Sequence, residues 1–239
     1  TSSNFSSNQA QHDGGVLFLS DATSKSKWTS TRDVFLNNVA VKGSGGAITS
    51  VGVQVTLSEK TTCDNNAALN GGGGCIMWDS LGKTAGSPLW DRVRPALDIG
   101  VVGSTNVAAF GNSLATLPTK ISMQAGRASM PTASTKDGSF HANNLPSVSL
   151  IDWYGTEVKG GGEGAVAGVL ESTAMVQITT FAPAHIDLLR GRDTESFVLR
   201  SGLAQFSELS LRGAPDSGPF LLHFAAELNL PSGNEKRTL

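Results

Sequence analysis

Apolar and polar residues alternate in short stretches along the whole chain, which is the pattern of β-strands that bury one face. Residues 51–57 place valine or leucine at every second position, and residues 148–152 and 174–179 show related alternation. Glycine, asparagine, serine and proline separate these stretches and provide turns. The pattern therefore predicts an all-β fold.

The first half contains three copies of one repeat, written Phe/Cys-x-x-Asn-x-Ala, a short gap, then Gly-Gly-x-aliphatic. The copies begin at Phe5, Phe35 and Cys63, and their shared asparagines are Asn8, Asn38 and Asn66. The paired glycines are Gly14, Gly15, Gly45, Gly46, Gly73 and Gly74. A period of about 30 residues with fixed Gly and Asn positions is typical of a solenoid.

A weaker fourth copy keeps Asn106-Val107-Ala108 and has Gly103 at the Phe position. It follows the third copy after about 40 residues, so we expect residues 80–96 to loop out. From residue 109 onward the Asn and Gly-Gly rhythm stops, and we place the end of the repeats at residue 110.

The repeat chemistry suits stacked coils of short parallel strands. Glycine pairs would supply turns where a side chain would collide with the next coil. Asparagines at one corner of every coil would stack as a hydrogen-bonded ladder, with Asn8, Asn38, Asn66 and Asn106 as its members. The Phe, Ala and aliphatic positions would point inward, with Phe5, Phe35 and Cys63 stacked at one corner.

Gly45-Gly46-Ala47-Ile48, preceded by Phe35-Leu36-Asn37-Asn38, resembles the paired GGAI and FxxN repeats of chlamydial polymorphic membrane proteins. Similar repeats occur in very large surface proteins of algae and other protists. The resemblance implies that residues 1–110 are the C-terminal part of a right-handed parallel β-helix displayed outside the cell.

The third repeat departs from that pattern, because Cys63 replaces the phenylalanine and Cys75 follows the glycine pair. If both side chains point inward, a disulfide would replace the missing aromatic ring. A secreted, β-rich context favours this pairing, and two buried free thiols are the alternative. We predict that Cys63 and Cys75 are bonded.

The second half predicts several short strands separated by turns, which is the pattern of a β-sandwich. The segments Asp152-Trp153-Tyr154-Gly155, 202–209 and 218–224 resemble conserved features of immunoglobulin-like modules of bacterial and protist surface proteins, and residues 108–118 resemble the junction that precedes such modules. The resemblance implies an immunoglobulin-like β-sandwich over residues 111–230. We expect residues 231–239 to be a linker to a next segment.

Composition narrows the range of partners. Only 16% of residues are charged, against about 25% in typical domains, and the net charge is −2. This balance gives no electrostatic basis for binding nucleic acid or an anionic membrane surface. No apolar stretch approaches the 18 or so residues of a membrane-spanning helix, so we expect no direct membrane span.

Catalytic signatures are missing from the sequence. The histidines, His12, His141, His185 and His223, form no metal-binding spacing, and no nucleophile elbow or phosphate-binding loop occurs. Acid/base catalysis needs carboxylates that converge on one face, and those of the first half do not recur at one repeat position. A groove lined by two or three of them is the less favoured alternative. We therefore expect no enzymatic activity, no metal and no cofactor. A carbohydrate-active enzyme is the least favoured of three functional hypotheses, after a structural module and an adhesin.

Two surface features bear on partners. Four tryptophans could form a sugar-binding platform or, alternatively, fill cores and interfaces; they are Trp28, Trp78, Trp90 and Trp153. Asn4-Phe5-Ser6 is an N-glycosylation sequon, which makes Asn4 a candidate glycan site in a secreted eukaryotic protein.

These features predict a structural module of a large extracellular fibre or cell-surface assembly, and the algal resemblance makes the ciliary hair, or mastigoneme, the specific candidate. Its expected partners are other segments or copies of the same large protein and other extracellular structural glycoproteins. An adhesin that binds glycans or receptors through exposed aromatic loops is the alternative. Because fold does not dictate function, the choice depends on the surface.

Overall fold

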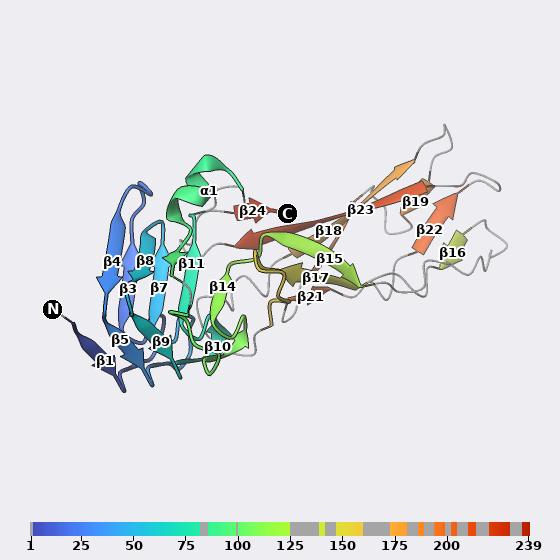
Figure 1. Ribbon diagram of the computed structural model, residues 1–239. Coiled ribbons are helices and arrows are strands. Elements are labelled where there is room, and N and C mark those ends of the chain that lie inside the picture. Colours follow the sequence, from blue (N-terminus) through green and yellow to red (C-terminus); the bar gives the residue numbers. More distant parts are fainter. Residues whose placement is uncertain are drawn as a thin grey trace.

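The computed structural model describes most of the first half of the chain and the main strands of the second half. The described residues are 2–81, 86–98, 100–124, 139–141, 147–159, 173–180, 186–188, 194–198, 202–204, 210–213, 220–229 and 236–239. Strands dominate in both halves, so the prediction of an all-β fold is confirmed (Figure 1). Strand pairing is parallel in the first half and antiparallel in the second.

In the first half the chain winds through successive coils, and each full coil adds one strand to each of four parallel sheets. The first coil holds β1 (Asn4–Ser6), β2 (Gln9–Ala10), β3 (Leu17–Ser20) and β4 (Lys27–Thr31). The second holds β5 (Val34–Leu36), β6 (Val39–Ala40), β7 (Ile48–Val51) and β8 (Gln54–Ser58). The third holds β9 (Thr62–Asp64), β10 (Ala67–Gly72), β11 (Ile76–Asp79) and β12 (Ala96–Leu97). A last, partial coil holds β13 (Val107–Phe110) and β14 (Leu114–Thr116).

The register of these sheets places equivalent repeat positions directly over one another. Phe5 pairs with Phe35, and Phe35 pairs with Cys63. The same in-register stacking joins β3, β7 and β11, where Ile48 lies between Leu17 and Ile76. Because parallel strands lie about 4.8 Å apart, identical inward positions form continuous columns of apolar side chains. Phe35, Ile48 and Val55 have no exposed surface in the resulting core.

The expected loop at residues 80–96 contains a short helix, α1 (Pro88–Val93). The Ser87 hydroxyl accepts a hydrogen bond from the Trp90 amide, and Pro88 occupies the first turn, where its missing N–H costs nothing. Trp90 and Val93 are buried against the interior of the coils. The helix therefore packs its apolar side on the stack rather than looping into solvent.

Parallel pairing continues beyond the predicted boundary at residue 110. β14 pairs with β11 in the same register as the earlier coils, so the stack extends to Thr116. Gly111 and Asn112 take the place of the glycine pair, and their carbonyls accept hydrogen bonds from Gly73 and Gly74. The sequence rhythm hides this turn because Asn112 replaces the second glycine.

The second half forms three antiparallel sheets in the described part of the chain. One holds β15 (Lys120–Gln124), β17 (Ser147–Ile151) and β21 (Leu203–Ala204). Another holds β16 (Ser139–His141), β22 (Ser210–Gly213) and β19 (Ile186–Leu188). The largest holds β20 (Thr194–Val198), β18 (Thr173–Thr180), β23 (Phe220–Asn229) and β24 (Lys236–Thr238).

Most predicted strands of this half occur, with shifted ends. β17 and β18 match the alternating residues 148–152 and 174–179, β21 lies in the segment 202–209, and β23 begins in the segment 218–224. Residues 205–209 and His185 lie outside the described residues. The predicted linker at 231–239 is wrong at its end, because residues 236–238 form β24 and pair with β23. Alternation is too short there to show a strand in the sequence.

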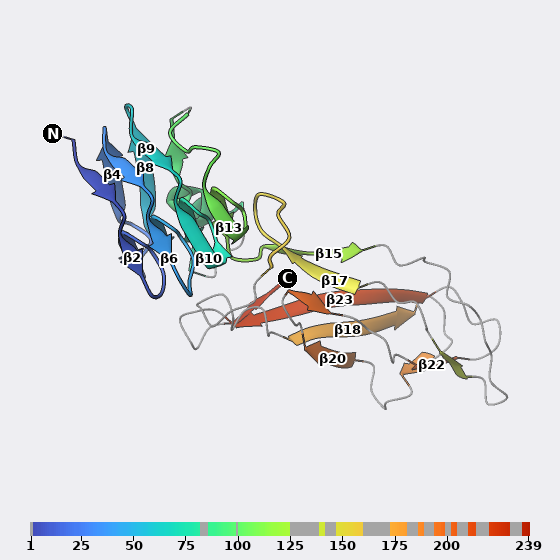
Figure 2. The ribbon, with the colours of Figure 1, turned by 90° about the horizontal axis from the view of Figure 1, so that it is seen from below.

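The coil stack and the antiparallel sheets follow one another along the length of the molecule (Figures 1 and 2). A shared cluster of apolar side chains joins them. Met77, Phe110 and Ala115 from the coils belong to the same cluster as Val148 and Leu150 from β17. The first coil lies at the opposite end, where Figure 2 shows no other strands beyond it.

Replacing Gly46 with alanine is expected to destabilise the coils by about 1–3 kcal/mol, in the range for an overpacked interior. An added Cβ would lie 2.6 Å from the backbone nitrogen of Ala67 in the next coil, and backbone cannot rotate away as a side chain can. Thermal unfolding followed by circular dichroism measures the effect. An unchanged midpoint would mean that the coils are not packed this closely.

Candidate functional site: the asparagine ladder and the aromatic junction

One row of asparagines, buried from its second member onward, ties all the coils together. The amide nitrogen and Nδ2 of Asn8 both donate to Oδ1 of Asn38, at 3.0 and 2.9 Å. Asn38 donates in the same way to Asn66, and Asn66 donates to Asn106. Asn38, Asn66 and Asn106 are at most 1% exposed. The structure thus brings the four repeat asparagines to one corner of the stack.

Each ladder asparagine after Asn8 also reaches back to the preceding coil. Nδ2 of Asn38 donates to the Phe5 carbonyl, that of Asn66 to the Phe35 carbonyl, and that of Asn106 to the Cys63 carbonyl. Every side chain in the interior of the row therefore uses its acceptor and both amide donors. Buried amides that are fully bonded in this way stabilise one register of strand pairing between coils over shifted registers.

The local backbone explains why an asparagine stands at this corner. The residues directly before three ladder positions, Ser7, Asn37 and Asn65, have φ values of 58°, 58° and 52°. This left-handed conformation turns the chain sharply between the first and second strands of each coil. The turn leaves the following amide N–H in the path of the neighbouring Asn oxygen, which accepts it.

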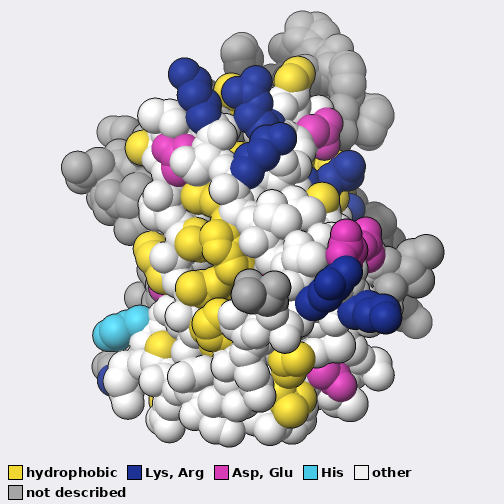
Figure 3. All heavy atoms as spheres, turned by 60° about the vertical axis from the view of Figure 1, so that its left-hand side comes forward, with side chains coloured by type: hydrophobic (Ala, Val, Ile, Leu, Met, Phe, Trp, Pro, Cys, Tyr) yellow, Lys and Arg dark blue, Asp and Glu magenta, His cyan; other side chains and the backbone are white. Residues whose placement is uncertain are grey.

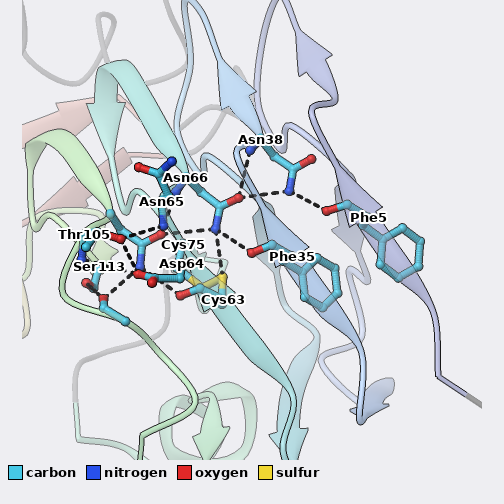
Figure 4. Close-up of a disulfide and its surroundings, with 12 residues drawn as sticks. Phe5, Phe35, Asn38, Cys63, Asp64, Asn65, Asn66, Cys75, Thr105 and Ser113 are labelled. Carbon is cyan, nitrogen blue, oxygen red and sulfur yellow. Dashed lines mark hydrogen bonds between the residues drawn. A yellow bond between two sulfur atoms is a disulfide. The ribbon is translucent and has the colours of Figure 1, made fainter.

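The predicted disulfide is present between Cys63 and Cys75. Its Cα atoms are 5.9 Å apart, and neither residue has exposed surface. Phe5 and Phe35 stack with ring centroids 4.9 Å apart, and Cys63 occupies the equivalent position in the next coil (Figure 4). The disulfide therefore fills the inward corner where the first two coils place aromatic rings.

Replacing both cysteines with alanine is expected to lower the free energy of unfolding by about 3 kcal/mol, from the lost constraint on a short loop. The double variant removes both thiols, so no unpaired thiol complicates the result. Denaturant unfolding of the oxidised parent and the variant measures the difference. A loss below about 1 kcal/mol would mean that the bond contributes little to the third coil.

A second polar row runs along the outside of the same corner. The Asn65 side chain donates to Asn37. The Thr105 hydroxyl donates to the Asp64 carboxylate (Figure 4). That hydroxyl lowers the pKa of Asp64 below its ordinary value. The first contact joins the surface of the third coil to the second, and the other joins the last coil to the third.

Aromatic side chains gather where the coil stack meets the antiparallel sheets. Trp90 of α1 lies between Trp78 of β11, at 4.8 Å between ring centroids, and Trp153 after β17, at 5.6 Å. The Trp78 Nε1 donates to the Tyr154 hydroxyl at 3.0 Å. Burial raises the pKa of that phenol. Residues from both halves thus form one aromatic cluster.

A buried ion pair lies beside this cluster. The Arg237 guanidinium of β24 donates to Oδ1 of Asp79 at 2.8 Å and to the Pro118 carbonyl at 2.9 Å. Its Cζ atom lies 6.0 Å from the Trp90 ring centroid, the outer limit of a cation–π contact. The C-terminal strand is therefore bonded both to the third coil and to the connection after the last coil.

Asp152 holds the first turn of the antiparallel region against the last coil. Its carboxylate accepts hydrogen bonds from the Thr156 amide at 2.8 Å and the Thr116 amide at 3.4 Å. The Trp153 amide in turn donates to the Thr116 hydroxyl. Burial raises the pKa of the Asp152 carboxyl despite these donors. The Asp-Trp-Tyr-Gly segment of the sequence thus connects the antiparallel region to the last coil through hydrogen bonds to Thr116.

The remaining sequence candidates do not converge. His12 lies in the loop after β2 and His223 lies on β23, and both are exposed. Asn4 is exposed on β1. No three His, Cys, Asp or Glu residues come together as a metal site in the described ranges. No helix long and apolar enough to cross a membrane occurs among the residues that the structure describes.

Searches of protein-family models, curated proteins and solved structures found no match to this chain. The role of the candidate site is therefore inferred from the geometry described above. The sequence pointed to the ladder and the disulfide but gave no sign of Arg237. Its partner Asp79 is distant in sequence, and only the meeting of the third coil with β24 brings the pair together.

Proposed function

We propose that this chain is a structural module of a large extracellular fibre or cell-surface assembly, composed of the end of a right-handed parallel β-helix and an immunoglobulin-like β-sandwich. The ciliary mastigoneme is the specific assembly that the sequence resemblance suggests. The module acts as a stiff connecting element and has no enzymatic activity of its own. Its partners are other segments or copies of a large protein and other extracellular structural glycoproteins.

The observation that carries the proposal is the continuous bonding across the junction. Arg237 bonds to Asp79 and Pro118, and the tryptophans of both halves contact one another. Two regions that are joined by a buried ion pair and shared apolar core resist bending far more than regions joined by a flexible linker. Such stiffness suits an element that holds a fixed direction within a fibre.

The buried disulfide supports the extracellular part of the proposal, since disulfides persist in oxidising compartments. The asparagine ladder supports the fibre part, because every coil is bonded to the next by side chains as well as backbone. Asn4 is exposed on β1, so a glycan there would point away from the core.

Immunogold electron microscopy of the source cells tests the proposal, with antibodies raised against the 239-residue chain. Gold particles along extracellular filaments or a surface coat are the expected result. Labelling confined to the cell interior would contradict it. So would a freely secreted protein that degrades a polysaccharide, because a carbohydrate-active enzyme would then be the better explanation.

A surface adhesin is the second candidate, on the basis of the exposed aromatic residues of the junction. Trp153 and Tyr154 are 36% and 43% exposed, and such rings can stack on sugar faces. A glycan array with the parent chain and a Trp153→Ala variant separates this function from the first. Specific glycan binding that the variant loses would favour the adhesin.

A further inference from the structure

The turn after β17 places two adjacent aromatic side chains at the surface of the junction. Trp153 and Tyr154 are 36% and 43% exposed. The Trp153 ring centroid lies 5.6 Å from that of the buried Trp90, and the Trp153 amide donates to the Thr116 hydroxyl. The Tyr154 hydroxyl accepts a hydrogen bond from Nε1 of Trp78. Both rings are therefore held in place by buried neighbours while part of each remains open to solvent.

Fixed, half-exposed aromatic rings suit a sugar as ligand. Trp and Tyr combine an apolar body with a polar tip, and the C–H face of a pyranose ring can cover the apolar body. Because Trp153 and Tyr154 are already ordered by their contacts, binding immobilises little further side-chain freedom. We call these two side chains the aromatic platform.

A guanidinium lies beside the aromatic platform. Arg94 follows Trp90 by one helical turn at the end of α1, and its backbone N–H donates to the Trp90 carbonyl at 3.2 Å. Residues four apart lie on the same side of a helix, which directs Arg94 toward the platform. Burial raises the pKa of Tyr154, whereas the hydrogen bond from Trp78 and the positive charge of Arg94 lower it. Such a charge effect requires the guanidinium and the phenol to be near one another.

No carboxylate of the described residues neutralises this guanidinium. Arg94 is exposed and forms no ion pair with them, Asp91 on the same helix included. Arg32 on the surface of the coils, by contrast, pairs with Glu59 at 3.2 Å. Basic and acidic side chains also lie close together on the face shown in Figure 3. Arg94 is thus available to a ligand, and its planar donors match a carboxylate or a sulfate group.

We propose that Trp153, Tyr154 and Arg94 form a binding site for an acidic sugar of an extracellular polysaccharide. The sugar ring stacks on the aromatic platform, and its carboxylate or sulfate accepts hydrogen bonds from the guanidinium. A neutral sugar gains only the stacking. The inference rests on the extracellular setting of the proposed function, and it assigns a ligand class to the aromatic surface of the second candidate. In a fibre or coat, the site attaches the module to an acidic matrix polysaccharide.

Isothermal titration calorimetry of the 239-residue chain tests the site with three tetramers, which consist of galacturonic acid, sulfated galactose and neutral galactose. We expect at least one acidic tetramer to bind about tenfold or more tighter than the neutral one, and the two acidic probes distinguish carboxylate from sulfate. Trp153→Ala should weaken acidic binding about tenfold through lost stacking. Arg94→Gln should reduce the affinity for the acidic tetramer to that for the neutral one.

Arg92→Gln is the matched control. It removes the same charge from the same helix, but Arg92 lies two residues from both Trp90 and Arg94, and residues two apart do not face each other on a helix. This variant should keep at least about half of the parent affinity, since its side chain points away from the site. If Trp153→Ala fails to fold, Arg94→Gln still decides the outcome, because the side chain that it changes is exposed.

Equal weakening by Arg92→Gln and Arg94→Gln would show attraction by net charge alone and would overturn the site. So would equal affinity for the acidic and neutral tetramers, or no binding of any tetramer. Binding is measured on the purified chain, whereas the proposed function is tested by where antibodies label the source cells. Labelled filaments without sugar binding would overturn the site alone, and interior labelling with acidic-sugar binding would overturn the proposed function alone.

Discussion

Replacing Asn66 with alanine is expected to lower the free energy of unfolding by about 4 kcal/mol, because several buried polar groups lose partners at once. The amide and Nδ2 of Asn38 would lose their shared acceptor. Oδ1 of Asn106 would lose a side-chain donor, and the Phe35 carbonyl would lose its donor from Nδ2. Asn38, Asn106 and Phe35 are at most 1% exposed, so these groups have no access to bulk water in the parent fold.

The same ladder provides a matched control. Asn8 occupies the equivalent position in the first coil but is exposed and accepts no ladder bond in the described structure. Asn8→Ala removes one side-chain donor at the end of the row, so we expect a loss of about 1 kcal/mol or less. Denaturant unfolding at one temperature measures both variants.

The position along the ladder, rather than the residue type, should therefore decide the effect. Asn38→Ala should resemble Asn66→Ala, because Asn38 is also buried and bonded on both sides. Equal, small losses for all three variants would show that stacked backbone pairing holds the coils and that the ladder adds little.

The repeat positions of the first half could be predicted from sequence because the coil interior imposes one requirement on every pass. A glycine is needed where the next backbone lies within contact distance, as at Gly46 and Gly74. An asparagine is needed where a buried N–H meets no backbone carbonyl. These requirements recur at a fixed interval and leave a visible pattern.

Elements that occur once leave no such pattern. Ser87 and Pro88 are ordinary helix-start residues, but a six-residue helix is too short for periodicity to show. β24 is shorter still, and its stability comes from pairing with β23 and from Arg237. Both elements are fixed by contacts between distant parts of the chain.

The junction could not be predicted from the sequence either, because its residue types are compatible with more than one structural role. The sequence alone allowed the tryptophans to be a sugar platform or a core. The structure places Trp78 and Trp90 inside, with little or no exposed surface, and leaves Trp153 partly exposed at the edge. In the sequence Asp79 is one of several scattered carboxylates, and only the folded chain brings Arg237 of β24 beside it.

That ion pair gives the second large expected effect. Replacing Arg237 with methionine keeps most of the apolar stem but leaves the Asp79 carboxylate buried without its positive partner. Breaking a buried pair from one side typically costs 3–5 kcal/mol, and we expect about 4 kcal/mol here. Lys159→Met, which removes an exposed pair with Glu157, is the control and should change stability by no more than about 0.5 kcal/mol.

A double variant separates the charge from the packing. Asp79→Asn in the Arg237→Met background removes the unpaired charge, and the asparagine oxygen can still accept the hydrogen bond that the Leu81 amide gives to Asp79. We therefore expect the double variant to recover at least half of the lost stability in denaturant unfolding. If the double variant stayed as unstable as Arg237→Met alone, the loss would come from the Pro118 hydrogen bond and the Trp90 contact instead of the buried charge. The junction would then be held by packing of β24, and its stiffness would not depend on the ion pair.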